Sequence, residues 1–364
     1  MRVCIVAGAR PNFIKVAPIV RAIRGAKEQG KVIDYSLVYA GTKEDPTLEP
    51  SLFDDLQIAP PNVYLGVECA SLNELTGRVM GEFEKYLAQH PTDVVIVVDD
   101  LASTLAAAIV TKKQGVTLAH LVAGTRSFDI NMPKEVNRLV IDGLSDLLFT
   151  AGHGSNTIVS REGAAQSKVY MVGNILMDTL RFNRQRLCRP AIFDTMSLSE
   201  RAYIVFTLNR RKLIADKENL KKMLVTLIEA AGDTPIVAPL RGLARLAVAD
   251  ILATLDTRPS TFHLIEPLSY LEFGWLTANA KGIVTDSGNV AEEATFNRVP
   301  CATLNSYTEH IETVRTGSNL LVGEDSEKLR QAVGDMVSDR WKPCSLPDRW
   351  DGRSAERIVQ TLLH

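Results

Sequence analysis

The chain contains 364 residues, of which 46% are hydrophobic and 23% charged, and its formal net charge is -2 at pH 7. This length favours two domains over a single core, and the composition is typical of a globular protein rather than a disordered one. The near-neutral charge gives no electrostatic reason to expect nucleic acid or an anionic membrane as a partner, and no apolar run reaches the roughly 20 residues of a spanning helix.

Short apolar runs alternate with longer amphipathic stretches along the chain, and this alternation predicts an α/β fold with parallel sheets covered by helices. In the first half the expected strands are Val3–Ala7, Ser36–Ala40, Val94–Val98, Leu118–Val122, Leu147–Thr150 and Val169–Val172. The expected helices there are Asn12–Gly25, Leu72–His90, Ser103–Gln114 and Lys134–Ser145.

The second half repeats this pattern. Its expected strands are Tyr203–Thr207, Pro235–Pro239, Phe262–Ile265, Gly282–Thr285 and Cys301–Leu304. Its expected helices are Lys217–Ala231, Ala244–Leu255, Ser269–Ala280, Val290–Asn297, Ser326–Val337 and Ser354–Leu363.

The two runs of strand and helix units join near Gly173–Asn174, before a polar, arginine-rich stretch. We therefore expect two doubly wound, Rossmann-like lobes at residues 1–173 and 174–350. The last helix, within residues 351–364, is compatible with either lobe by composition, and packing back on the first lobe is one option. Lobes of this kind, facing each other, form a cleft at the carboxyl ends of their strands, where open α/β sheets bind ligands.

The cysteine pattern and the first residues indicate the compartment. No two of the five cysteines have the C-x-x-C spacing of a structural zinc site, and their odd number favours free thiols in a reducing environment. The first residues predict a strand, not an apolar signal segment with a cleavage site. We expect a cytoplasmic protein with no metal and no bound cofactor.

The first predicted strand runs into Gly8-Ala9-Arg10-Pro11-Asn12 and then a helix. Backbone N–H groups at a helix start favour an anion, Pro11 suits the first helical turn, and Arg10 adds charge-assisted bonds to phosphate oxygens. The alternative is a tight turn with a surface arginine, and the spacing does not decide between them. The loop is not a G-x-G-x-x-G fingerprint, which argues against a Rossmann dehydrogenase.

A second loop, Thr285-Asp286-Ser287-Gly288-Asn289, also joins a predicted strand to a helix, and this helix contains Glu292 and Glu293. Its hydroxyl and N–H groups suit a phosphate, and a carboxylate one or two turns further accepts hydrogen bonds from ribose hydroxyls. Alternatively, Asp286 and Ser287 only cap the helix and the glutamates face solvent.

The two loops, together with further segments along the chain, resemble the non-hydrolysing UDP-N-acetylglucosamine 2-epimerases. The two-lobed fold of that family is akin to that of the GT-B glycosyltransferases. The resemblance runs nearly end to end. The matching segments are Gly8–Pro18 (G-A-R-P-N-F-I-K-V-A-P), Ala40–Asp45, Asp93–Asp100, Ala119–Ser127, Pro133–Arg138, Val172–Asn174, Ser269–Phe273, Asp286–Ala294 and Thr308–Glu312.

The resemblance implies a UDP-sugar, UDP-N-acetylglucosamine or a relative, as ligand, and a homodimer. It places Arg10 near the phosphates, Ser287 and Gly288 at the diphosphate turn, Glu293 at the ribose and Phe273 near uracil. The full set of UDP-binding residues that we expect is Arg10, Lys15, Arg210, Phe273, Ser287, Gly288, Asn289 and Glu293.

In the family, the C2 proton leaves while the anomeric bond to UDP breaks, which gives 2-acetamidoglucal and UDP as intermediates. General acid and base groups and stabilisation of the leaving diphosphate serve such a reaction. Asp100 matches the aspartate of the family's H-G-D segment. Glu135 matches its catalytic glutamate, and Arg138 the arginine that follows.

Two further catalytic positions of the family are changed. Its E-A-G-x-R glutamate falls on Val122, and its T-G-H-R-R-E histidine falls on Asn209, which hydrogen-bonds but does not titrate. Either the chemistry is weakened, or it is rebuilt with nearby His120 and with Asp99 beside Asp100, because adjacent carboxylates can form an acid/base pair. Alternatively, His120 is packed and Asp99 points to the opposite side.

Three functions remain open. The first is a UDP-N-acetylglucosamine 2-epimerase, an isomerase of polysaccharide biosynthesis, in which Asp100, Glu135, Arg138, His120 and Asn209 form the catalytic side. The second is a nucleotide-sugar hydrolase or a glycosyltransferase-like enzyme, and the third is a non-catalytic UDP-sugar-binding protein. The family's regulatory pocket is also altered, since its R-P-E segment reads His310-Ile311-Glu312 here.

Overall fold

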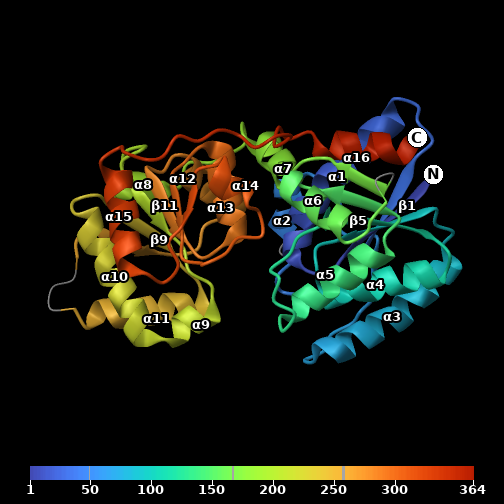
Figure 1. Ribbon diagram of the computed structural model, residues 1–364, viewed down its shortest axis with the longest axis horizontal. Helices are drawn as coiled ribbons and strands as arrows, with labels where there is room; N and C mark the ends of the chain where they lie inside the picture. Colours follow the sequence, from blue (N-terminus) through green and yellow to red (C-terminus); the bar gives the residue numbers. More distant parts are fainter. Residues whose placement is uncertain (49, 166–167, 256–258) are drawn as a thin grey trace. The chain divides into compact units, whose positions relative to one another are not determined.

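The computed structural model describes residues 1–48, 50–165, 168–255 and 259–364. They form two compact units (Figure 1). Unit 1 comprises Met1–Phe182 together with Asp348–His364, and unit 2 comprises Asn183–Pro347.

Unit 1 is built on a parallel sheet of seven described strands in the order β3-β2-β1-β4-β5-β6-β7. Central strand β4 is buried along its whole length, as parallel strands covered on both faces are. The strands are β1 (Arg2–Ala7), β2 (Asp34–Tyr39), β3 (Val63–Tyr64), β4 (Val94–Val98), β5 (Thr117–Ala123), β6 (Leu147–Thr150) and β7 (Val169–Met171). The helices are α1 (Arg10–Glu28), α2 (Pro50–Leu56), α3 (Leu72–Gln89), α4 (Ala102–Lys113), α5 (Pro133–Leu144), α6 (His153–Arg161), α7 (Leu176–Asn183) and α16 (Ser354–Leu363).

Unit 2 repeats the design with six described parallel strands in the order β10-β9-β8-β11-β12-β13. The strands are β8 (Ile204–Phe206), β9 (Ile236–Pro239), β10 (Phe262–Ile265), β11 (Gly282–Thr285), β12 (Cys301–Thr303) and β13 (Asn319–Leu321). The helices are α8 (Ala191–Thr195), α9 (Arg211–Ala215), α10 (Lys217–Ala231), α11 (Gly242–Ala253), α12 (Tyr270–Ala278), α13 (Gly288–Asn297), α14 (Glu312–Arg315) and α15 (Ser326–Val337).

The predicted α/β class with two doubly wound sheets is confirmed. Strand bounds such as Val94–Val98 and Gly282–Thr285 agree residue for residue with the sequence analysis. Strands β3 and β13 were not predicted, because two or three residues are too short for a periodic pattern.

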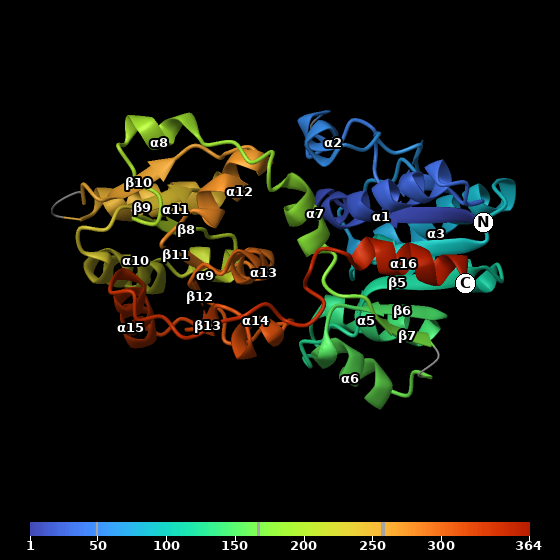
Figure 2. The same ribbon diagram turned by 90° about the horizontal axis from the view of Figure 1, so that it is seen from above.

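The boundary between the units lies later than residues 173 and 174, because α7 packs with unit 1. In α7, the Thr179 hydroxyl donates to the Ile14 carbonyl at 2.6 Å. The Asp178 carboxylate accepts from the backbone N–H groups of Ser354 and Ala355, at 3.0 and 2.8 Å, and so caps α16. Helix α16 lies beside α1 (Figure 2), so the C-terminal segment from Asp348 onwards belongs to unit 1.

Strand β7 forms one edge of the unit 1 sheet. Two arginines from the C-terminal segment donate to backbone carbonyls at its end. Arg357 Nη1 is 2.9 Å from the Val172 oxygen, and Arg349 Nη1 bonds the Met171 oxygen.

Candidate functional site

The predicted catalytic residues Asp100, Glu135 and Arg138 lie together in unit 1. Asp100 follows β4, and the other two residues lie in the first turns of α5. Arg138 Nε donates to Asp100 Oδ2 at 2.7 Å, and Arg138 Nη1 donates to Glu135 Oε2 at 3.1 Å. All three side chains are buried, so the arginine holds two carboxylates in a fixed geometry.

Glu135 accepts hydrogen bonds from the loop before α5. The Ser127 N–H and hydroxyl donate to it at 2.8 and 2.9 Å, and the Phe128 N–H donates at 2.9 Å. Burial alone raises the pKa of Glu135, but these bonds and the Arg138 guanidinium outweigh it and bring the pKa below its usual value. Glu135 is therefore an ionised carboxylate at neutral pH.

The first loop uses some of its donors internally. Asn12 Oδ1 accepts from the Gly8 and Ala9 N–H groups at 2.9 and 3.2 Å. These two N–H groups therefore bond within the loop, whereas the sequence analysis expected them to face an anion. A side chain at Gly8 would meet Ser103 Oγ within 1.8 Å, which explains the glycine. Arg10 is half-exposed and makes no hydrogen bond or ion pair within the described part of the chain.

The adjacent carboxylates of Asp99 and Asp100 point to different partners. Asp99 Oδ1 lies 2.6 Å from Lys15 Nζ on α1, whereas Asp100 binds Arg138 on α5. Each carboxylate thus has its own cation, and the two do not form the shared acid/base pair that the sequence left open. The alternative, in which Asp99 points to the other side, describes the structure.

His120 is buried inside unit 1, with both ring nitrogens facing oxygens. Its Nε2 is 2.9 Å from the Asp99 carbonyl, and its Nδ1 is 2.6 Å from Asp142 Oδ1. Arg126 Nη2 lies 2.7 Å from the second oxygen of Asp142. The structure therefore places His120 in a buried polar network in which both ring nitrogens already have partners.

Val122 occupies a bulge near the end of β5, where the pairing with β6 shifts by one residue between Leu121 and Ala123. Its φ of 71° is a conformation that a β-branched residue rarely adopts, and such conformations typically cost about 1–3 kcal/mol. The side chain is half-buried and offers no proton donor or acceptor. The bulge is strained whether or not it serves catalysis.

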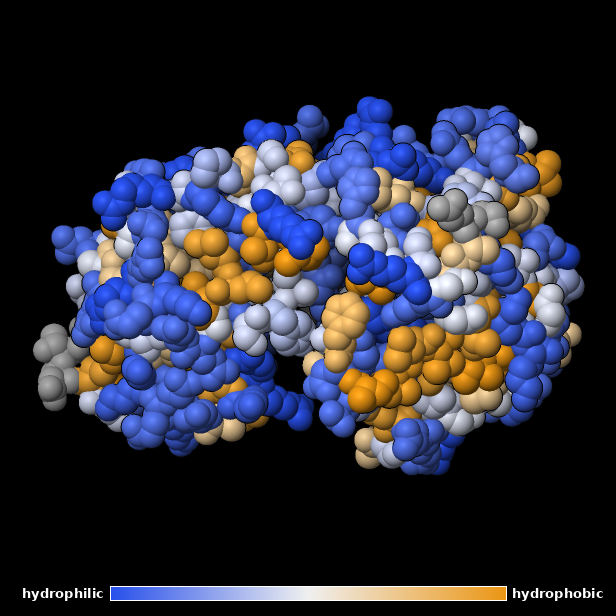
Figure 3. All heavy atoms as spheres, in the orientation of Figure 1, coloured by the Kyte–Doolittle hydropathy of each residue, from blue (hydrophilic) through white to orange (hydrophobic). Residues whose placement is uncertain are grey.

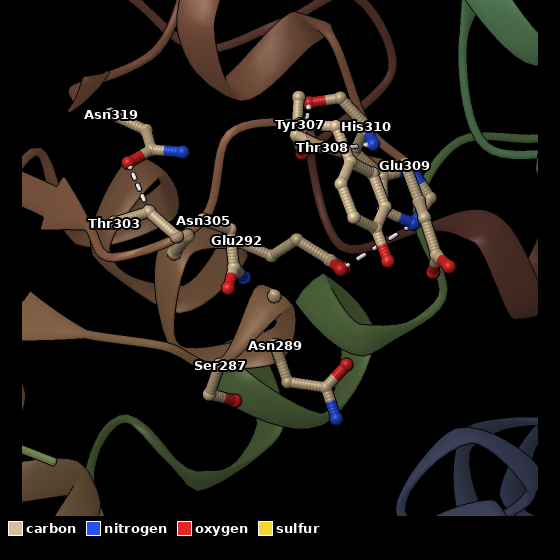
Figure 4. A pocket seen from close by; sticks show the side chains of 12 residues that line it. Ser287, Asn289, Glu292, Thr303, Asn305, Tyr307, Thr308, Glu309, His310 and Asn319 are labelled. Carbon is tan, nitrogen blue, oxygen red and sulfur yellow. Dashed lines mark hydrogen bonds and ion pairs between the residues drawn. The ribbon is translucent and has the colours of Figure 1, made fainter. Parts of the chain in front are cut away.

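In unit 2, Ser287, Gly288 and Asn289 form the start of α13 and line a pocket of about 280 Å³. Ser287 Oγ caps the helix by accepting from the Val290 N–H at 3.5 Å, while Gly288 and Asn289 are exposed. In the close-up of Figure 4, Glu292 points toward His310 across this pocket, with the two side chains 3.4 Å apart. An open helix start of this kind favours an anion, and phosphate binding by this loop stays a prediction.

Asp286, just before this turn, supports a neighbouring loop. Its carboxylate accepts from the Asn209 N–H at 2.8 Å and from the Arg210 N–H at 2.6 Å, which places both residues next to β11. The Asn209 side chain is exposed. The Arg210 guanidinium donates to the Leu304 carbonyl at 3.1 Å and pairs with Glu324, so this arginine already has an acidic partner.

The two glutamates of α13 differ in position. Glu292 lines the pocket, whereas Glu293, predicted at the ribose, does not line it, although both are buried. Burial and the neighbouring Glu292 raise the pKa of Glu293 to about 8. Phe273, in α12, is half-buried and packs on the core of unit 2.

The pocket also contains residues that the sequence analysis did not single out. Asn305 donates from Nδ2 to the Asp286 carbonyl at 3.0 Å, and Tyr307 is 45% exposed beside it. Both residues lie in the loop after β12. Because β12 pairs in parallel with β11, this loop lies next to the loop after β11, where α13 begins. Their spacing from Ser287 in the sequence gives no signal of this contact.

No helix among the described residues is long and apolar enough to cross a membrane. In the same ranges, no group of three or more His, Cys, Asp or Glu side chains is arranged to hold a metal ion.

Two parallel doubly wound sheets define an α/β protein of the class that binds its ligands at the carboxyl ends of the strands. The profile of the family "UDP-N-acetylglucosamine 2-epimerase" matches residues 26–363. The chain therefore belongs to the UDP-N-acetylglucosamine 2-epimerase family, as the sequence resemblance predicted.

Individual relatives agree with this assignment. The chain is 34% identical to the UDP-N-acetylglucosamine 2-epimerase of Methanocaldococcus jannaschii, over 100% of this chain and 99% of that protein. The crystal structure of that enzyme with UDP-GlcNAc and UDP has a TM-score of 0.83, at 33% identity, covering 100% of this chain and 99% of that one. A UDP-2,3-diacetamido-2,3-dideoxy-D-glucuronate 2-epimerase of Pseudomonas aeruginosa is 31% identical, over 93% of this chain and 94% of that protein.

Proposed function

We propose that the protein binds UDP-N-acetylglucosamine or a related UDP-sugar and inverts the configuration at C2 of the sugar. The observation that supports this most strongly is the buried cluster of Asp100, Glu135 and Arg138. The carboxylate is ionised, and an arginine and three further donors hold it in one direction, so a base is present in a fixed geometry. The relatives named epimerases support the same activity.

In this proposal the diphosphate lies at the start of α13. Gly288 and Asn289 supply backbone N–H donors there, and Ser287 supplies its hydroxyl. Arg10, in unit 1, is assigned to the phosphates by the family resemblance. Asn209 presents an amide that hydrogen-bonds a phosphate. We assign Lys15, Arg210, Phe273 and Glu293 to the nucleotide on the strength of the family resemblance alone.

The proposed reaction has two steps. Glu135 accepts the C2 proton while the anomeric carbon–oxygen bond breaks, and the electron pair of the C2–H bond forms the double bond of 2-acetamidoglucal as UDP departs. In the second step the electron pair of the double bond takes a solvent-derived proton on the opposite face of C2, and UDP adds to the anomeric carbon. The second proton donor is not Val122, because valine has no proton to give, and this makes turnover slower than with a glutamate there.

The direct test is incubation with UDP-N-acetylglucosamine and with UDP-N-acetylmannosamine in heavy water, followed by proton NMR. Incorporation of deuterium at C2, with appearance of the other epimer, is the expected result. Release of UDP without deuterium in recovered sugar nucleotide would favour a hydrolase or a glycosyltransferase-like enzyme, which the changes at Val122 and Asn209 allow. If calorimetry detects UDP binding but neither reaction occurs, the protein is a non-catalytic UDP-sugar-binding protein.

We further propose a cytoplasmic homodimer. An exposed apolar patch supports the assembly: Val136, Leu139 and Val140 on α5 are 43%, 39% and 38% exposed (Figure 3). Apolar side chains grouped in this way typically mark a protein interface. The molar mass in solution, measured by light scattering, tests this part independently of activity.

A further inference from the structure

The imidazole of His120 lies between two oxygen acceptors inside unit 1. Its Nε2 faces the main-chain carbonyl of Asp99 at 2.9 Å, and its Nδ1 faces the Asp142 carboxylate at 2.6 Å. The Asp99 carboxylate is turned away, toward Lys15 on α1. A carbonyl and an ionised carboxylate only accept hydrogen bonds, so each ring nitrogen needs its own proton to bond its partner. The contacts therefore fit the doubly protonated, positively charged form of the ring.

Asp142 is an acceptor on both of its oxygens. Its Oδ2 accepts from the Gly124 N–H at 3.1 Å and lies 2.7 Å from Arg126 Nη2. Burial alone raises the pKa of Asp142, but the charges and hydrogen bonds of His120 and Arg126 outweigh burial and bring the pKa below its ordinary value. The Asp142 carboxylate is therefore ionised at neutral pH and has no proton to donate to the ring.

The balance of charge in this network favours the same form of the ring. Arg126 also binds Glu162, with Nε 2.9 Å from one carboxylate oxygen and Nη2 2.5 Å from the other. With a charged ring, the two cations His120 and Arg126 face two carboxylates. With a neutral ring, one negative charge is left over, although His120, Arg126 and Asp142 are at most 5% exposed. An uncompensated buried charge is strongly unfavourable.

The ring connects the turn after β4 to α5. Glu135, Arg138 and Asp142 are spaced three and four residues apart, so they lie on one buried face of this helix. The Asp99 carbonyl, which the ring binds, directly precedes Asp100, which Arg138 binds at 2.7 Å. Consecutive residues of one turn are thus attached to α5 at two points, one helical turn apart. Two attachments fix the orientation of the helix face, which a single ion pair does not.

We propose that His120 is held as an imidazolium in the folded protein and acts as a positioning residue. This buried cation clamps the turn that carries Asp100 to the helix that carries Glu135 and Arg138. The consequence for catalysis rests on the proposed function, whereas the clamp itself is a property of ligand-free unit 1. His120 contacts no substrate in this proposal and acts on the reaction through the positions of Asp100 and Glu135.

The charge on the ring is tested by NMR of the ligand-free protein labelled with ¹⁵N-histidine. The measurement is made at about pH 7.5, where a histidine in water is mainly neutral. Both ring nitrogens of His120 should carry a proton, and the signals are assigned by their absence from a variant at position 120. A proton on only one of the two nitrogens overturns the proposal. This measurement uses the parent protein, so it decides the question even if a variant folds poorly.

Two variants and a control test the clamp. His120→Gln offers one donor and one acceptor, so it cannot donate to both partners. His120→Gln with Asp142→Asn keeps the charges balanced and allows the asparagine amide to donate to the glutamine oxygen, so that neutral hydrogen bonds replace the ionic ones. Thr111→Val is the matched control, because it removes a buried hydroxyl that donates to the Ala107 carbonyl at 2.7 Å within α4.

The position of the turn is measured by hydrogen exchange of the Arg138 Nε–H, which binds Asp100. His120→Gln should accelerate this exchange about tenfold, because loss of one attachment allows local opening. The double variant should return the rate to within about threefold of the parent, and Thr111→Val should leave it within about twofold. An unchanged rate in His120→Gln, or an equal acceleration by Thr111→Val, rejects the clamp.

The consequence for catalysis is measured last. His120→Gln should lower kcat about 100-fold, the effect of a misplaced group, while the Kd for UDP stays within about threefold. A kcat close to that of the parent, despite faster exchange at Arg138, rejects the positioning role. Failure of the parent protein to bind UDP or to exchange C2 hydrogen contradicts the proposed function instead. The protons on His120 and the exchange at Arg138 do not depend on turnover, so the two failures are distinguishable.

Discussion

Near the carboxyl ends of its strands, unit 1 pairs the carboxylates of its candidate site with cations, whereas unit 2 leaves a helix start open. Asp99, Asp100 and Glu135 are each bonded to a cationic side chain in unit 1. In unit 2, the exposed residues Gly288 and Asn289 border a pocket. Paired, buried charges keep a fixed geometry, as proton transfer requires, while open N–H donors are available to an anion. The difference supports the proposal that residues of unit 1 transfer the proton and that residues of unit 2 bind the diphosphate.

The largest expected effect breaks the unit 1 side of this comparison. Glu135→Gln keeps the size of the side chain but removes the base, so kcat should fall by about 10²–10⁴. The Kd for UDP should stay within threefold, because the proposed diphosphate donors at the start of α13 lie in unit 2. Rates of C2 exchange and calorimetry with UDP measure the two quantities separately, and a comparable loss in both would contradict the division.

The unit 2 side is tested at Gly288, where an added side chain meets no atom within 4 Å. Gly288→Asp places a negative charge beside the proposed diphosphate and should weaken UDP binding by roughly 10–100-fold, since like charges at close range repel. Gly288→Ala fits the same space without charge and serves as the control, with a Kd within threefold of the parent. Equal binding by both variants would move the diphosphate elsewhere.

Restoring the family's groups sharpens the comparison in the opposite direction. Val122→Glu with Asn209→His returns a titratable group to each position and should raise kcat about tenfold, less than the roughly 10²–10⁴-fold that a group already held in a catalytic geometry contributes. The matched control is Val122→Gln with Asn209→Gln, which adds polar side chains that do not titrate. If both double variants gain equally, proton transfer is not what these positions lack.

The remaining prediction concerns the pH dependence of stability, not activity, and the residue is Glu293. Its folded pKa of about 8 lies above the ordinary value of 4.5, so the folded state holds a proton that the unfolded state releases between these two values. Stability is therefore expected to fall as pH rises from about 5 to 8, by at most roughly 1.4 kcal/mol per pH unit. Glu293→Gln should flatten this slope in thermal unfolding from pH 5 to 8. Parallel slopes for parent and variant would show that Glu293 does not titrate there.

Local pattern predicted the elements well where they are long or fully apolar. Val94–Val98 and Lys217–Ala231 have the predicted bounds because their periodicity and burial agree. Asp100, Glu135 and Arg138 were grouped through the family resemblance, and the structure brings them into contact.

Contacts that depend on pairing between distant segments were not predictable in this way. Asn305 and Tyr307 reach the α13 pocket through a strand pairing, and the sequence does not reveal the direction of the Asp99 carboxylate. The donors of the first loop illustrate the same limit. Whether Gly8 and Ala9 offer their N–H groups to a ligand depends on the rotamer of Asn12, which sequence spacing does not determine.

The two arginines at the end of β7 have a consequence for self-association. Edge strands with unpaired carbonyls are templates on which another chain adds a strand, the first step of aggregation. Arg349 and Arg357 occupy the carbonyls of Met171 and Val172, so an incoming strand would have to displace two charged donors. Growth of the sheet at this edge is therefore disfavoured.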